Sequence, residues 1–341
     1  MKIKKNFFLF LILLILLDSC AKNPQKPLRM NIVQSYPTLS SITDFDLTNK
    51  TIFVAEEQIG LAIFNEESTE LIRRIDRNDP YLNSITNLST VSYYEPEHKL
   101  FIADRSNSSL QKIFIFDYYQ DTQILAENSD ALTGGTATVH DIVFTHNIEQ
   151  DATFYVFWGY MSSGTYYLRK NLYHSINNSI TTISITPIQN IAQRIYLSQD
   201  YLAIAMGQYG VAIYDHNLQL LLTISTPSFA IDVLMLNNYL LVADRNDAVL
   251  IYDLKNLNNY FLANRINLQG QPVSFSSTNN YLAVGTPSNG IYLYNIKDCL
   301  EPKFIDRIPF SLVGPISRLK FYQNDLYAAC RNVGLIKIKI K

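Results

Sequence analysis

A hairpin motif recurs along almost the whole chain, and it constrains the fold more than any other feature of the sequence. Each copy is a short apolar strand, a polar or glycine-bearing turn and a second apolar strand, which is the pattern of a β-hairpin. Six copies align directly: TIFVAEEQIGLAIFN at 51–65, KLFIADRSNSSLQKIFIFD at 99–117, YLAIAMGQYGVAIYD at 201–215, YLLVADRNDAVLIYD at 239–253, YLAVGTPSNGIYLYN at 281–295 and DLYAACRNVGLIKIK at 325–339. A repeat of this length indicates a single repeat architecture.

The spacing of the copies predicts seven of them. The second strands of two successive copies begin at Ile113 and Val211, 98 residues apart, which is about twice the usual step. A degenerate copy fits between them, with strands at Phe154–Trp158 and Thr165–Lys170 around a turn at 162–164. One further strand precedes each hairpin and one follows it. Four antiparallel strands in about 40–50 residues form one blade of a β-propeller. We therefore predict an all-β propeller of seven four-stranded blades, with six or eight as the alternatives.

The two ends of the repeat region predict how the ring closes. The last copy ends with the chain and has no outer strand of its own, whereas Met30–Tyr36 is an extra strand-like segment before the first copy. Pairing of this segment beside Ile336, Ile338 and Ile340 would complete the last blade and cover its open edge. The propeller is therefore expected to span residues 31–341.

The first thirty residues predict export and lipidation. Lys2, Lys4 and Lys5 precede an apolar run at 7–17, which matches a secretory signal peptide and is too short to span a bilayer. The sequence Leu17-Asp18-Ser19-Cys20 resembles a bacterial lipobox, apart from Asp18. We expect a signal peptide at 1–19, lipidation of Cys20 and a tether at 20–30. Lipid chains on Cys20 would attach the protein stably to a membrane. Ala21, in place of Asp after the cysteine, favours the outer membrane.

Charge excludes two classes of partner. Without the three lysines and one aspartate of the signal peptide, the chain has 25 basic and 29 acidic residues, a net charge near −4. That balance is atypical of a nucleic-acid-binding domain or of a polybasic lipid-binding surface. We expect no nucleic-acid partner, and the sequence predicts no oligomeric state.

The repeat resembles the LVIVD-repeat family of exported bacterial propellers. The first element of that repeat appears as Leu241-Val242-Ala243-Asp244, and the second as Val249-Leu250-Ile251-Tyr252-Asp253. The resemblance covers most of the chain from Ser41 onward and implies a scaffold rather than a reaction. The final aspartate of the second element becomes Asn65 and Asn295 in other copies. Exchange between Asp and Asn suggests capping of a turn, since both side chains bond nearby backbone amides.

No catalytic or metal-binding constellation is apparent. The five histidines are scattered along the chain without the spacing of metal ligands. We expect no catalytic residue, no metal and no cofactor. Cys299 follows a third strand and Cys330 ends a second strand, which places them near opposite faces of the ring. We therefore predict that these two cysteines do not form a disulfide.

One face of the propeller collects the candidate binding residues. The turns inside the hairpins lie on the same side as the links between blades, because successive strands alternate in direction. These turns carry the candidate residues Glu56, Asp104, Arg105, Asp244, Arg245 and Arg331. A solvated turn accounts for the repeated Asp-Arg pair. A ring of arginines that binds carboxylates is the alternative.

The expected function is that of a non-catalytic protein-binding or scaffolding module, lipid-anchored in the bacterial cell envelope. An envelope protein is the expected partner. Two alternatives stay open from the sequence. One is a metal-assisted, lactonase-like hydrolase of the propeller type, which would need carboxylates at the mouth of the channel. The other is a receptor for a small ligand or polysaccharide.

Overall fold

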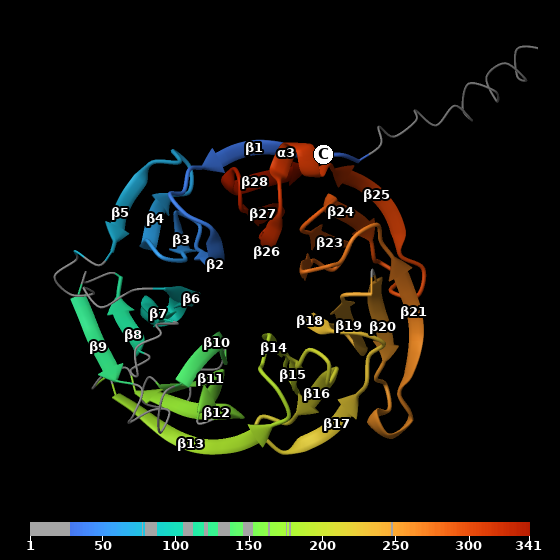
Figure 1. The fold of residues 1–341 in the computed structure, drawn as a ribbon, viewed down its shortest axis with the longest axis horizontal. Helices are drawn as coiled ribbons and strands as arrows, with labels where there is room; N and C mark the ends of the chain where they lie inside the picture. The colour runs from blue at the N-terminus through green and yellow to red at the C-terminus, as the bar shows by residue number, and fades with distance from the viewer. Residues whose placement is uncertain are drawn as a thin grey trace, which may run out of the picture.

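The chain folds as a ring of seven four-stranded antiparallel sheets around a central channel (Figure 1), as the repeat predicts. The computed structural model describes residues 28–76, 78, 87–104, 112–118, 122–128, 137–145, 153–162, 164–174, 176, 179–246 and 248–341. For residues 112, 122–128, 137–140, 153, 154 and 162 it describes the backbone alone. The predicted signal peptide, Cys20 and most of the tether lie outside the described residues.

The first four blades follow one another along the chain, and each runs from its innermost strand to its outermost. Blade 1 is β2 (Ile42–Leu47), β3 (Thr51–Glu56), β4 (Gly60–Asn65) and β5 (Leu71–Ile75). Blade 2 is β6 (Leu88–Tyr94), β7 (Lys99–Asp104), β8 (Lys112–Asp117) and β9 (Thr122–Asn128). Blade 3 is β10 (Ala137–Phe144), β11 (Thr153–Ser162), β12 (Thr165–His174) and β13 (Ser179–Ile188). Blade 4 is β14 (Arg194–Leu197), β15 (Leu202–Ala205), β16 (Val211–Tyr214) and β17 (Leu220–Ile224).

The last three blades include the one that closes the ring. Blade 5 is β18 (Ala230–Leu236), β19 (Tyr239–Asp244), β20 (Ala248–Asp253) and β21 (Phe261–Asn267). Blade 6 is β22 (Ser274–Ser277), β23 (Tyr281–Thr286), β24 (Gly290–Asn295) and β25 (Lys303–Ile308). Blade 7 is β26 (Ile316–Tyr322), β27 (Asp325–Cys330), β28 (Gly334–Ile340) and, as its outer strand, β1 (Met30–Tyr36). The described residues also contain three short helical turns: η1 (Glu95–Glu97), η2 (Leu257–Asn259) and α3 (Phe310–Val313).

The predicted closure of the ring is confirmed. Strand β1 pairs antiparallel with β28, and Ile32 lies opposite Ile338 in this pairing. The side chain of Tyr36 is fully buried in a cluster that contains Tyr327 of blade 7 and Phe45 of blade 1. The hydrophobic core thus lies between neighbouring blades, and the N-terminal strand contributes to the contact where the two ends of the repeat meet.

Glycine recurs at the start of the third strand for a steric reason. Gly290 has a φ of +89°, and a Cβ added there would lie 2.0 Å from the carbonyl oxygen of Ile308 at the end of the outer strand. Any other residue would place its Cβ against that backbone. Residues with a Cβ also disfavour a positive φ of this size. Equivalent positive-φ glycines open β4 and β28. The turn glycine of the repeat is therefore required by the packing of the outer strand.

The predicted capping role of the residue that ends the third strand is also borne out in several blades. The side-chain oxygen Oδ1 of Asn65 accepts hydrogen bonds from the backbone N–H groups of Glu67 and Ser68. Asp215 caps its turn in the same way. In blade 2, the Asp117 carboxylate accepts a hydrogen bond from the buried Lys99 ammonium at 2.6 Å.

Candidate functional site

The central channel is walled by the innermost strand of each blade (Figure 1). Polar side chains of these strands line it, among them Thr43, Arg194 and Ser317. Most of these strands contain a β-bulge near their first residue, for example between Ile42 and Asp44 in β2 and between Ile316 and Arg318 in β26. A bulge turns two successive side chains away from strict alternation. As a result, Thr43 lines the channel while Asp44 contacts the next blade.

The residue that follows the bulge, or the equivalent residue of an inner strand without a bulge, belongs to a polar layer around the channel. We call it the waist layer. Each of its members lies opposite an alanine or glycine of the second strand of its blade. The waist layer consists of Asp44, Thr90, Asp141, Arg194, Asp232, Ser274 and Arg318. No member of this layer was among the predicted site residues. The sequence feature that marks the layer is a polar residue two places after the first apolar residue of an inner strand, as in Ile42-Thr43-Asp44.

The second strand keeps a small residue opposite the waist layer because the next blade packs there. A Cβ at Gly285 of blade 6 would lie 2.6 Å from Cγ2 of Ile316 in blade 7. A Cβ at Gly159 of blade 3 would lie 2.4 Å from Cβ of Ala192, in the link to blade 4. Small residues here let the inner strands of neighbouring blades approach closely enough for hydrogen bonds between them.

The waist-layer side chains join each blade to the next. The carboxylate of Asp141 accepts a hydrogen bond from the Ile195 N–H at 2.8 Å, and that of Asp232 accepts one from the Phe275 N–H at 3.0 Å. Asp44 Oδ2 accepts a hydrogen bond of 2.6 Å from the Thr90 hydroxyl. A backbone N–H that is buried without a partner is costly, and these oxygens satisfy such groups on the adjacent blade.

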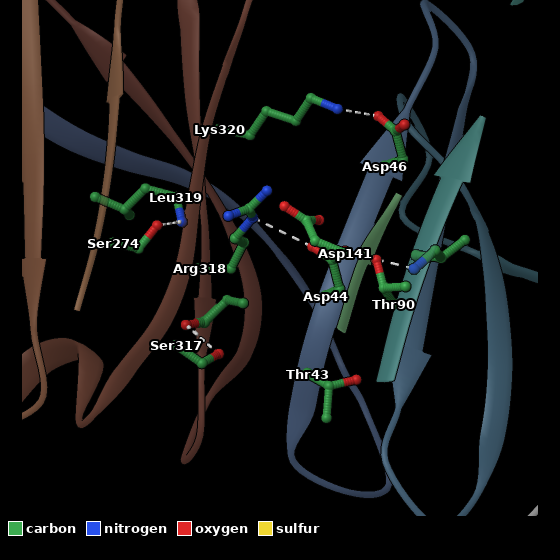
Figure 2. Close-up of polar contacts among 12 residues, drawn as sticks. Thr43, Asp44, Asp46, Thr90, Asp141, Ser274, Ser317, Arg318, Leu319 and Lys320 are labelled. Carbon is green, nitrogen blue, oxygen red and sulfur yellow. Dashed lines mark hydrogen bonds and ion pairs between the residues drawn. The ribbon is translucent and has the colours of Figure 1, made fainter. Parts of the chain in front are cut away.

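Ion pairs also link neighbouring blades at this level. Figure 2 shows Arg318 extending from β26 toward Asp44 and Asp141, and its Nε lies 3.2 Å from Asp44 Oδ1. Burial lowers the pKa of Arg318, but Asp44, Asp141 and Asp232 outweigh it and hold that pKa above its ordinary value. Burial raises the pKa of Asp141 against the opposing effect of Arg194 and Arg318. These side chains form a charged constriction that separates two chambers.

The two chambers differ in charge. The chamber on the face of the links, here the link-face chamber, has a volume of about 360 Å³, and its charged lining residues are Arg194, Arg331 and Glu57. The chamber on the opposite face has a volume of about 520 Å³. Its charged lining residues are Asp44, Asp46, Glu95, Asp141, Arg318 and Lys320. The lining charges therefore sum to +1 for the link-face chamber and to −2 for the opposite one.

The three carboxylates predicted for the binding face are buried in the fold. Each ends the second strand of its blade and accepts a hydrogen bond from the backbone of the link that enters the same blade. Glu56 accepts from Leu39 N at 2.7 Å, Asp104 from Asn87 N at 2.8 Å, and Asp244 from Ser228 N at 3.0 Å. Glu56 also forms an ion pair with Arg74 at 2.7 Å. These residues hold the links in place and do not present their carboxylates at the surface.

The predicted arginines are placed differently from one another. Arg331 is exposed and lines the link-face chamber. Arg245 is exposed as well, but its guanidinium stacks 4.5 Å from the ring centroid of Phe229 in the preceding link. Arg105 lies outside the described residues. The structure thus brings one of the predicted arginines to the mouth of the channel and adds Arg194, which the sequence analysis did not select.

Exposed apolar side chains share this face with the arginines. Leu39 is 69% exposed, and it lines a hollow of about 300 Å³ together with Val333 and Arg331. The exposed apolar residues on the links and turns of this face are Leu39, Tyr209, Phe310, Leu312 and Val333. Arg331 and Ser41 line both this hollow and the link-face chamber, so the two are adjacent.

Neither a metal-binding cluster nor a membrane-spanning helix is present among the described residues. No group of three or more His, Cys, Asp and Glu side chains in this part of the chain is arranged to hold a metal ion. None of the helices in the described ranges has the length and apolar character needed to cross a membrane. Cys299 and Cys330 are both buried and unpaired, as predicted from their position on opposite faces.

Comparison with known proteins supports the fold alone. No protein-family model matches the chain, and no curated protein of similar sequence matches it. Among solved structures, the WD40 repeats of RRP9 align with a TM-score of 0.70 at 15% identity, over 92% of this chain and 97% of that one. The structure of U3-55K aligns with a TM-score of 0.69 at 15% identity, over 91% and 98%. The β-propeller domain of Cps50 (Swd1) from Myceliophteria thermophila gives 0.66 at 11% identity, over 91% and 98%.

Proposed function

We propose that this protein is an exported lipoprotein whose propeller binds another protein of the bacterial cell envelope without catalysing a reaction. One observation carries the proposal: Arg331 lies between the channel mouth and a hollow flanked by the exposed side chains of Leu39 and Val333. Exposed apolar residues beside an arginine are typical of the centre of a protein interface. The solved propellers of similar shape, among them one described as WD40 repeats, are consistent with such a module.

The state of the channel carboxylates favours binding over hydrolysis. A metal-assisted hydrolase would need carboxylates available at the channel mouth. Glu56, Asp104 and Asp244 instead accept backbone hydrogen bonds within the fold, and Asp141 and Asp232 bond the adjacent blade. These five carboxylates thus have structural partners.

Attachment through Cys20 forms the second part of the proposal. The signal-like segment, the lipobox-like sequence and the resemblance of the repeat to the LVIVD family support it. We expect the full-length protein to partition into the detergent phase of a Triton X-114 extraction, and a Cys20→Ser variant to leave that phase. Equal partitioning of the two proteins would contradict lipidation, and mass spectrometry of the N-terminal peptide would identify the modification directly.

Capture of the partner tests the binding function. Crosslinking in intact cells, followed by purification from solubilised membranes, compares the wild type with Arg245→Ala/Arg331→Ala. A matched control, Lys255→Ala/Lys297→Ala, removes two positive charges from turns on the opposite face. We expect the wild type and the control to capture the same envelope protein and the arginine variant to lose it. Capture of no specific protein by any of the three would contradict the proposal.

A further inference from the structure

The guanidinium of Arg194 is the least satisfied charged group of the waist layer. Its side chain is 14% exposed, and its one ionic partner in the described part of the chain is Asp141 Oδ1, at 3.9 Å. Among the described residues, no hydrogen bond involves the Arg194 guanidinium, although a guanidinium carries five N–H donors. Arg194 lines the link-face chamber, whereas Asp141 lines the opposite one. The donors of Arg194 are therefore accessible from the link-face chamber.

The remaining charges of the chamber favour an anion. Arg331 lines the same chamber from its rim, and neither its guanidinium nor the Glu57 carboxylate has a partner among the described residues. Asp44 and Asp141 line the opposite chamber, on the other side of the constriction. A carboxylate that enters from the link face therefore meets one arginine at the rim and a second, largely buried one at the base. Guanidinium groups bind carboxylates through paired, charge-assisted hydrogen bonds.

The hydroxyl groups of the chamber specify the rest of the ligand. The Thr43 hydroxyl donates its proton to the Leu88 carbonyl at 2.9 Å, and the Ser317 hydroxyl donates to the Ile42 carbonyl at 2.8 Å. The Ser89 hydroxyl likewise donates to the Ala103 carbonyl at 3.1 Å. Because the protons of Thr43 and Ser317 are engaged, these two hydroxyl oxygens offer only lone pairs to the chamber. A complementary ligand must bring O–H or N–H donors of its own.

We propose that the link-face chamber binds a small hydroxylated carboxylate, such as a sugar acid. Its carboxylate contacts Arg194, with Arg331 at the entrance, and its hydroxyl groups donate to Thr43 and Ser317. The volume of about 360 Å³ lies at the lower end of the range for small-ligand sites. This site shares Arg331 with the protein-binding surface proposed above, but the ligand lies inside the channel and not on the exposed apolar residues.

Calorimetric titration of the full-length, detergent-solubilised protein with D-glucuronate tests the proposal. D-glucose has similar hydroxyls without the carboxylate, and acetate has a carboxylate without hydroxyls. We expect glucuronate to bind at least about tenfold more tightly than either, since each lacks one set of the charge-assisted or neutral hydrogen bonds. Absence of glucuronate binding at millimolar concentration, or equal binding of glucose or of acetate, would overturn the proposal.

Two variants locate the site, and one serves as a control. Arg194→Gln should weaken glucuronate binding at least about tenfold by removing the charge at the base. Arg331→Gln, at an exposed position that the fold does not require, should weaken it by a smaller factor and keeps the test valid if Arg194→Gln fails to fold. Arg245→Gln removes an equal charge on the same face outside the chamber and should leave binding unchanged. Binding that survives Arg331→Gln together with a folded Arg194→Gln would contradict the assignment.

Discussion

At the scale of single residues, the polar groups of the inner strands act mainly as connectors between blades. Asp232 is an example: its Oδ1 accepts from the Val233 N–H at 2.9 Å and its Oδ2 from the Phe275 N–H of the next blade. Ser274 has the same role one blade later, accepting from the Leu319 N–H at 3.1 Å. Both residues place an acceptor oxygen on a short side chain opposite a backbone N–H of the next blade.

Replacement of Asp232 tests this role. Asp232→Ala leaves the buried Phe275 N–H without an acceptor, and we expect it to lower the free energy of unfolding by about 1–3 kcal/mol. Asp232→Asn keeps one acceptor oxygen and should lose less. Asp200→Ala, an aspartate on an exposed turn, serves as the control and should change stability by less than about 0.5 kcal/mol. Urea unfolding measures all three, and equal stability of Asp232→Ala and wild type would refute the connector role.

At the scale of elements, the outer strand of every blade is interrupted by a β-bulge. The pairing between the third and the outer strand shifts register in all seven blades, so each outer strand contains a bulge. Unpaired edges of sheets are templates for aggregation, and a bulge disrupts the regular row of donors and acceptors. Strand β1 takes part in this pattern although it comes from the other end of the chain, with its bulge between Ile32 and Gln34.

Truncation before Thr38 tests the role of β1. The shortened chain loses the buried side chains of Met30 and Tyr36, each contributing about 1.5–3 kcal/mol, and leaves β28 unpaired along its outer side. We expect a lower melting temperature by circular dichroism and self-association by size-exclusion chromatography. A chain that begins at Leu28 is the matched control and should behave as the full propeller. A synthetic peptide of residues 28–37 should restore stability, and an unaffected truncated monomer would contradict this role.

At the scale of the whole molecule, the ring depends on contacts between blades 1 and 7. Glu66, after β4 of blade 1, accepts a hydrogen bond of 2.6 Å from the Tyr327 hydroxyl and another from the Lys337 ammonium, both in blade 7. The backbone carbonyl of Glu66 accepts from the Tyr36 hydroxyl of β1 at 2.6 Å. One residue thus contacts three strands of the closing blade, whose contacting residues lie 30 to 271 positions away in the sequence.

The contribution of Glu66 to the stability of the closed ring should depend on pH. Burial raises the pKa of Glu66, but the hydrogen bonds from Lys337 and Tyr327 outweigh it and hold the pKa below its ordinary value. A lowered pKa in the folded state stabilises the fold above the unfolded value of about 4.3, and this contribution is lost as pH falls through the folded value. We expect Glu66→Gln to be less stable than wild type near neutral pH, with the difference shrinking toward about pH 3. A difference independent of pH in urea unfolding would contradict this assignment.

The number of reactive thiols per chain tests both the unpaired state of Cys299 and Cys330 and the lipidation of Cys20. Burial raises the pKa of Cys330 to about 12, so Cys330 should react slowly in the folded protein. In the unfolded, non-reduced protein both Cys299 and Cys330 should react, because neither is in a disulfide. Of the three cysteines in the sequence, Cys20 stays unreactive if it carries a thioether-linked lipid. Two reactive thiols per chain are expected; three would contradict lipidation, and none would contradict the unpaired cysteines.

The sequence by itself determined the architecture, because strand alternation and turn chemistry are local. The hairpin repeat predicted seven blades, Met30–Tyr36 predicted the closing strand with its observed bounds, and the placement of Cys299 and Cys330 predicted two unpaired cysteines. Even the degenerate third copy is a full blade, although its strands β11 and β12 have ten residues each and exceed the predicted ones.

Only the tertiary structure decided which polar residues are available to a ligand. Asp104 and Asp244 looked like surface turn residues, since nothing in their own repeat shows that a link N–H lies opposite their carboxylates. Arg194 was not selected, since its position at the base of a chamber depends on six other blades. The partners of these groups come from segments at least 16 residues away and often from a neighbouring blade. Local patterns specify strands and turns, whereas hydrogen-bond satisfaction in the channel depends on how the assembled blades meet.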